Sequence, residues 1–181
     1  MTIRTFRGDT WEPAKNWTLE NIYDDPKAIV IKGGKFTVWD MLGVNKAYTG
    51  PTKNGMLIIE PFTDIYKTEY SAEDVLKNCI ETMAQMESIN LFLNGKAIIR
   101  ENQEGVFYRN QAYAQWMRSI GLKPATRSYH FAGKAVDFDE EGASAEQTRR
   151  KLDKVWPFRM ETNTPNWVHI DTGKGVKRFK P

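Results

Sequence analysis

The two histidines of this 181-residue chain lie in two short segments whose residue types suit a zinc site. Residues 128–137 contain His130 and Asp137, and residues 167–171 contain His169. A catalytic zinc ion usually takes three protein ligands and keeps a fourth position for water. His130, Asp137 and His169 meet that requirement. On their own, these residues predict metal-assisted hydrolysis.

The local sequence patterns favour convergence of these groups. A strand over residues 167–171 has a side-chain period of two, so His169 and Asp171 would share one face while Val168 and Ile170 turn toward the core. In the first segment, Gly133 permits a tight turn. The histidine before that turn and the aspartate after it could then approach one ion.

The two segments resemble the D-Ala-D-Ala carboxypeptidase family of zinc peptidases, which includes phage endolysins and murein endopeptidases. The shared pattern is Ser-x-His-x-x-Gly-x-Ala-x-Asp, followed downstream by aromatic-Val-His-Ile-Asp-Thr-Gly. In that family the first His, the Asp and the downstream His hold zinc. The resemblance therefore implies that His130, Asp137 and His169 are the zinc ligands.

A third feature of the family is a Gly-aromatic-Arg turn that precedes the first zinc motif. Residues 105–109 resemble it, with one residue added between the glycine and the aromatic-Arg pair. The resemblance implies that Arg109 binds a substrate carboxylate or the developing oxyanion, although a surface ion pair is the competing interpretation. Ser128 and Tyr129 flank the first ligand, and we expect them to orient His130 or to line the substrate pocket.

The chain departs from the family at the catalytic base. Many members have a Glu three residues before the final zinc His, and this position is Asn166 here, whose amide cannot act as a base. Murein hydrolases that end in a His-Val-Asp-Thr-Gly-like segment also lack that Glu. Asp171 is one candidate base or partner of the ligand. Glu161 is the alternative, brought toward the metal by a bend at Pro165.

Composition indicates an ordinary globular chain, with 40% hydrophobic and 27% charged residues. We find no apolar run long enough to span a membrane and no secretory signal peptide. We expect a protein made in the cytoplasm that acts on the cell wall after release, in a phage lysis or virion context. The net charge of +3 is too modest to indicate nucleic-acid binding. We expect a monomer, and we expect Cys79 to be a buried apolar residue.

The order of the expected elements predicts an α+β fold. Residues 1–60 form an N-terminal extension with a hairpin around Gly33 and Gly34, and residues 61–181 form the zinc peptidase domain. The expected elements of that domain are a helix over 71–89, a strand over 96–100, helices over 111–121 and 144–156, and two final strands. A small antiparallel sheet carries the ligands, as in the Hedgehog/D-Ala-D-Ala peptidase-like fold that the resemblance implies.

These observations lead to two hypotheses about function. The first is a zinc-dependent peptidoglycan peptidase, a carboxypeptidase or an endopeptidase of the endolysin type, that hydrolyses a bond of the stem peptide or cross-bridge. The second is a non-catalytic zinc domain that binds a wall polymer or a protein partner, as Hedgehog domains do. Asn166 at the usual position of the Glu favours the second hypothesis.

Overall fold

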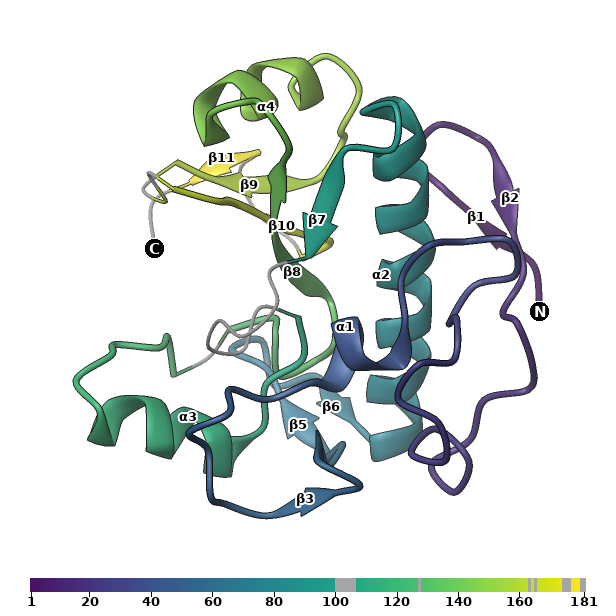
Figure 1. The fold of residues 1–181 in the computed structure, drawn as a ribbon. Helices are drawn as coiled ribbons and strands as arrows, with labels where there is room; N and C mark the ends of the chain where they lie inside the picture. Colours follow the sequence, from purple (N-terminus) through teal and green to yellow (C-terminus); the bar gives the residue numbers. More distant parts are fainter. Residues whose placement is uncertain (100–106, 127, 163, 165, 174–176, 180–181) are drawn as a thin grey trace.

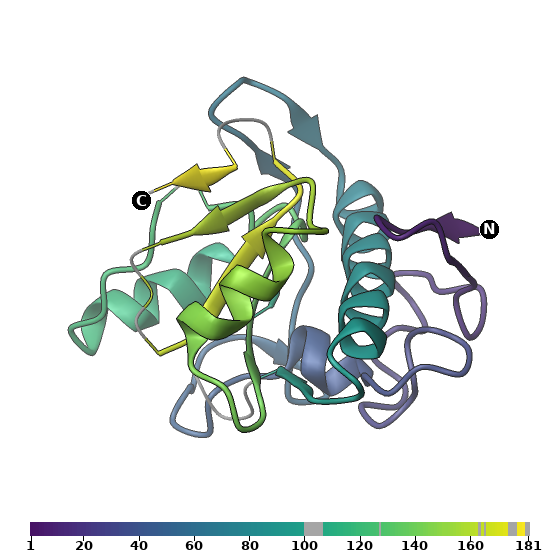
Figure 2. The same cartoon turned by 90° about the horizontal axis from the view of Figure 1, so that it is seen from above.

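A long helix, α2 (Ala72–Phe92), lies between the main sheet and the N-terminal segment (Figure 1). The computed structural model describes residues 1–99, 107–126, 128–162, 164, 166–173 and 177–179. Seen from above, the main sheet lies on one side of α2, and the N-terminal segment with strands β1 (Ile3–Arg4) and β2 (Thr10–Trp11) lies on the other (Figure 2). The architecture is therefore of the α+β class.

The predicted helix over residues 71–89 is confirmed and extends by one further turn. Ser71 and Asp74 form a capping box, in which each side chain accepts a hydrogen bond from the backbone N–H of the other residue. The helix ends before Asn94 and Gly95, which both have positive φ. The apolar residues that α2 buries are Val75, Leu76, Cys79, Ile80, Met83, Ala84, Met86 and Ile89. Cys79 is fully buried, as expected, and burial raises the pKa of its thiol.

Polar residues of α2 bind segments that pack around it. Thr82 Oγ1 donates to the carbonyl of Gly133 (2.9 Å), and Asn90 Oδ1 accepts from the backbone N–H of Ala97 (3.2 Å). Ser88 Oγ donates to Asp9 Oδ1 (3.1 Å). These bonds join α2 to the turn at Gly133, to Ala97 and to the N-terminal segment. Helix α2 is therefore packed on several sides, unlike an amphipathic helix with one face in solvent.

The main sheet has five strands in the order β11-β9-β10-β8-β7. Their bounds are β7 Ala97–Ile99, β8 Ala135–Glu140, β9 Arg159–Glu161, β10 Val168–Asp171 and β11 Arg178–Phe179. Strands β7, β8, β10 and β9 pair antiparallel, which confirms the predicted small antiparallel sheet, and β11 adds a parallel strand beside β9. Val136, Phe138, Met160, Val168 and Ile170 are buried in the core. The residues that alternate with them point to the opposite face.

Two shorter helices follow the predicted positions. Helix α3 (Gln111–Ser119) begins after Asn110, whose side chain accepts from the N–H of Tyr113. Helix α4 (Ala145–Leu152) begins at a capping box but ends four residues before the predicted end. Trp156 leaves the helix because its ring is buried in the core, in edge-to-face contact with Phe6 at 5.1 Å. Tertiary packing ends this helix.

The hairpin predicted around Gly33 and Gly34 is confirmed only in part. Ile29 and Thr37 form an isolated antiparallel bridge. The second strand is wrong, because Thr37 and Asp40 form a capping box that begins helix α1 (Val38–Leu42). The remaining strands of this region are β3 Thr52–Lys53, β4 Met56–Leu57, β5 Phe62–Thr63 and β6 Glu69–Tyr70, in two short antiparallel pairs.

One cluster of buried apolar side chains contains residues from Ile3 to Ile170. Residues on both sides of position 60 belong to it, so the expected extension and the expected peptidase domain share a core; the boundary between them stays a prediction. Among the described residues, no helix combines the length and apolar character needed to cross a bilayer.

Glu87 of α2 offers a test of how the N-terminal segment is held. Its Oε1 accepts backbone N–H bonds from Lys35 (2.7 Å) and Phe36 (2.8 Å), and the residue is 2% exposed. We expect Glu87→Leu to lower the free energy of unfolding by about 2 to 4 kcal/mol, because two N–H groups lose their buried acceptor. Urea denaturation followed by circular dichroism measures this.

The matched control is Glu81→Leu on the same helix, because Glu81 is partly exposed and forms a 4.0 Å pair with Lys77. We expect this change to stay within about 0.5 kcal/mol of the parent protein. Equal losses in the two variants would contradict the role given to Glu87.

Candidate metal centre

His130, Asp137 and His169 converge at the middle of the main sheet. One ligand atom from each lies within 4.8 Å of the other two. His130 Nε2 is 3.3 Å from His169 Nδ1 and 3.5 Å from Asp137 Oδ2, and His169 Nδ1 is 2.7 Å from Asp137 Oδ1. In a tetrahedral site with metal–ligand bonds of about 2.0 to 2.1 Å, neighbouring ligand atoms lie about 3.3 Å apart. The group could therefore hold a metal ion.

The strand pairing explains why two of these residues meet. In the β8–β10 ladder, Asp137 is directly opposite His169. Side chains of such a cross-strand pair lie on the same face, so the carboxylate and the imidazole come into contact. The predicted alternation in residues 167–171 is confirmed, with Val168 and Ile170 in the core.

A tight turn brings His130 to the same place. Gly133 has a φ of +70°, and a Cβ there would lie 2.5 Å from Cys79 Sγ and 2.8 Å from the carbonyl oxygen of Val75. Only glycine fits this approach of the turn to α2. The predicted turn is thus confirmed, and α2 fixes its position.

Each imidazole has its second nitrogen next to an oxygen acceptor. His130 Nδ1 is 2.5 Å from the carbonyl oxygen of Phe107, and His169 Nε2 is 3.5 Å from Asp171 Oδ2. Metal-ligating histidines usually have such an outer partner, which fixes the tautomer and the ring orientation. His130 therefore presents Nε2 to the centre of the site and His169 presents Nδ1.

The three groups carry different charges in the absence of an ion. Burial lowers the pKa of His130. Burial alone would also lower the pKa of His169, but Asp137 and Asp171 raise it to about 10. The two imidazoles hold the pKa of the Asp137 carboxyl well below its usual range, against the effect of burial. At neutral pH, the His169 imidazole is therefore protonated, and its Nδ1 donates to Asp137 Oδ1 (2.7 Å).

Arg109 lies beside this group, on the segment 107–110, whose backbone forms hydrogen bonds with His130. The backbone N–H of Arg109 donates to the carbonyl of His130 (3.3 Å). Phe107, two residues earlier in the chain, contacts the His130 ring through its carbonyl. The side chain is 6% exposed; burial lowers the pKa of its guanidinium, and the charge of Asp137 opposes that shift. Arg109 is thus a buried residue near the candidate ligands, not a surface ion pair. Gly105 of the expected turn lies outside the described residues.

The two candidate bases lie on the ligand face of the sheet but in different surroundings. Asp171 is 2% exposed, and its Oδ1 accepts the N–H of Gly173 (2.8 Å). Glu161 is half-buried, and burial raises its pKa. The charges of His169, Asp137 and Asp171 act on it, so it lies near the candidate site. Pro165, the expected bend, is outside the described residues.

The residues beside the first ligand differ in their contacts: those of Ser128 are local, whereas Tyr129 reaches Gly173 and Arg159. Ser128 Oγ accepts the N–H of His130 (3.3 Å), which helps to form the turn. The Tyr129 ring lies so close to Gly173 that a Cβ there would be 2.1 Å from it. Their expected contact with substrate stays a prediction. Asn166 is exposed.

Sequence reasoning missed Arg159. This residue is opposite Asp171 in the β9–β10 ladder, and its Nε is 3.5 Å from Asp171 Oδ1. The only signal in the sequence was its spacing of two from Glu161, which places both on one face of a strand. The backbone carbonyl of Phe107, which contacts His130 Nδ1, could not be identified from the sequence, because every residue type has such a carbonyl.

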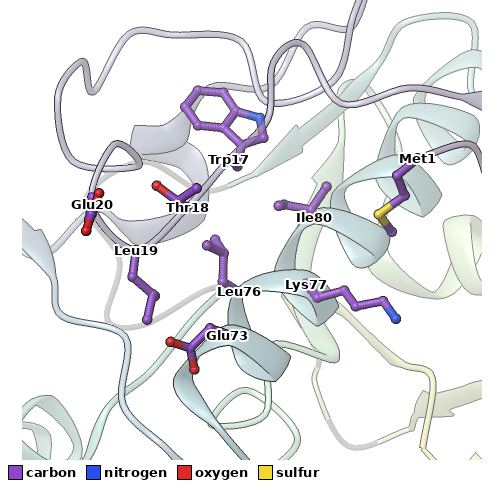
Figure 3. A pocket seen from close by; sticks show the side chains of 9 residues that line it. All are labelled: Met1, Trp17, Thr18, Leu19, Glu20, Glu73, Leu76, Lys77 and Ile80. Carbon is purple, nitrogen blue, oxygen red and sulfur yellow. The ribbon is translucent and has the colours of Figure 1, made fainter.

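A separate cavity of about 450 Å³ lies between α2 and the N-terminal segment (Figure 3). Trp17, Leu19, Leu76 and Ile80 provide apolar walls, and it contains none of the candidate site residues. Convergent polar groups with perturbed pKa values lie at the candidate metal centre, which is therefore the better candidate for chemistry.

No family model, curated protein or solved structure matches this chain. The candidate site therefore depends on its own geometry and on the sequence motifs.

Metal binding should release a proton. His169 has a pKa of about 10 without metal, and coordination through Nδ1 requires the neutral ring. His130 has a lowered pKa and Asp137 is already ionised, so we expect about one proton per ion at pH 6.5. Calorimetric titration with Zn²⁺ in buffers of different ionisation enthalpy gives this number. Binding that releases no proton would contradict the charge assignment.

Proposed function

We propose that this protein is a zinc-dependent peptidase that hydrolyses a peptide bond of peptidoglycan. The observation that carries the proposal is the convergence of His130 Nε2, His169 Nδ1 and the Asp137 carboxylate, with both outer imidazole nitrogens next to acceptors. Three protein ligands leave one coordination position for water, as in catalytic zinc sites. The substrate class comes from the resemblance of the two motifs to D-Ala-D-Ala carboxypeptidases and murein endopeptidases, and we propose the fold of that family as well.

Zinc fits this ligand set better than the harder cations do. Two imidazoles and one carboxylate are typical zinc ligands, whereas Mg²⁺ and Ca²⁺ prefer sites built of oxygen atoms. When bound, zinc supplies a water of lowered pKa and polarises the scissile carbonyl.

We propose Glu161 as the general base. A base must reach the attacking water, and Glu161 is half-buried on the ligand face, with its pKa raised by burial. A raised pKa favours return of the proton to the leaving amine. Asp171 is less suited, because its oxygens face His169, Arg159 and the N–H of Gly173.

Arg109 would hold a negatively charged part of the substrate. Its guanidinium is buried and feels the charge of Asp137, so it lies near the position of the reacting carbonyl. A guanidinium can pair with a carboxylate through two hydrogen bonds or stabilise an oxyanion. Ser128 and Tyr129 would border the same pocket. The partner is then a stem or cross-bridge peptide, which the protein meets after release from the cell that makes it.

A second candidate is a zinc domain that binds a wall polymer or a protein without hydrolysing it. Asn166, at the position where many family members have a catalytic Glu, favours this alternative. The two proposals share the metal site and differ in the need for Glu161.

The deciding experiment compares zinc content with release of new amines from purified peptidoglycan. We expect one zinc per chain in the parent protein and in Glu161→Gln, with kcat reduced roughly 10²- to 10⁴-fold in that variant. His130→Ala should lose both zinc and activity, because it removes a ligand. Glu141→Gln is the control, since this exposed loop residue follows β8 and lies outside the candidate site.

Stoichiometric zinc without amine release from several wall types would contradict the peptidase and favour the binding domain. Full activity in Glu161→Gln would remove Glu161 as the base while leaving the peptidase in place.

A further inference from the structure

Arg159 and Asp171 form a charged pair behind the metal ligand His169. They are directly opposite each other on β9 and β10, with Arg159 Nε 3.5 Å from Asp171 Oδ1. The Asp171 side chain is 2% exposed and the Arg159 side chain 16% exposed. A carboxylate buried to this extent needs a positive partner or several hydrogen bonds to stay ionised.

Two aromatic rings lie against the Arg159 guanidinium. Its Cζ lies 4.1 Å from the centre of the Phe179 ring and 5.5 Å from the centre of the Tyr129 ring. A guanidinium stacks on such rings, whereas a lysine ammonium has no plane to stack. The strand pairing and the two rings together hold Arg159 against Asp171.

The two oxygens of Asp171 have different roles. Oδ1 faces Arg159 and accepts the N–H of Gly173 (2.8 Å), and Oδ2 is 3.5 Å from His169 Nε2. An acceptor at Nε2 keeps the proton of the neutral imidazole on that nitrogen and leaves the Nδ1 lone pair for the metal. The orientation of the carboxylate therefore determines which nitrogen of His169 is presented.

We propose that Arg159 is a positioning residue, which holds Asp171 so that His169 binds the metal through Nδ1. This inference rests on the metal site of the proposed function, but it does not depend on hydrolysis. Arg159 places a positive charge beside Asp171 on the neighbouring strand. Without the guanidinium, Asp171 can rotate away from His169 or toward the ion.

The test measures the affinity for Zn²⁺ by competition with a chromogenic chelator, and the absorption spectrum of the Co²⁺ form. We expect Arg159→Met to bind Zn²⁺ roughly ten- to a hundredfold more weakly and to show an altered Co²⁺ spectrum. Arg159→Lys keeps the charge and should recover part of the affinity. The control is Arg178→Met, because Arg178 pairs with Asp153 from the adjacent strand β11. We expect the parent affinity there.

A double-mutant cycle with Asp171→Asn separates positioning from general damage to the fold. If Arg159 acts through Asp171, the effect of Arg159→Met falls to less than threefold in the Asp171→Asn background. Equal effects in the two backgrounds, or parent affinity and spectrum in Arg159→Met, would overturn the inference. If Arg159→Met does not fold, Arg159→Lys supports the same cycle. A parent protein that binds zinc but releases no amines would refute the peptidase alone.

Discussion

The Asp137 carboxylate lies between two buried imidazoles, and the stability of this arrangement depends on the contacts around it. Placing a charge in a protein interior is costly unless it is paired and hydrogen-bonded. His130 and His169 provide the pairing, and both lower the pKa of Asp137. Each imidazole in turn needs an acceptor for its outer nitrogen. The carbonyl of Phe107 and the carboxylate of Asp171 are those acceptors.

These outer partners come from chain segments far apart in the sequence, and α2 contacts both the turn that carries His130 and the main sheet. The turn that carries His130 packs on α2 at Gly133. The neighbouring strand β7 binds the C-terminal part of the same helix through Asn90. The geometry of the site therefore depends on the shared core, in which residues of the N-terminal sixty also take part. A change that loosens α2 would move His130 relative to the sheet.

The features predicted well from the sequence depend on short separations. The period of two around His169, the turn at Gly133 and the capping box before α2 each involve fewer than ten residues, and all three are present. The pairing of Arg159 with Asp171 depends on the register between two strands, which no local pattern sets. The second strand of the hairpin expected around Gly33 and Gly34 is wrong, because the capping box at Thr37 begins a helix there.

The structure also separates two carboxylates that the sequence left equivalent as candidate bases. Asp171 is buried, and its contacts with Arg159 and His169 fix the position of its carboxylate. It is therefore suited to orient an imidazole. Glu161 is half-buried and its pKa is raised by burial. Environments that differ in this way commonly divide roles between two carboxyl groups in one site. In the proposed peptidase, Asn166 would not remove the capacity for proton transfer, because Glu161 on β9 lies on the ligand face and would supply the base.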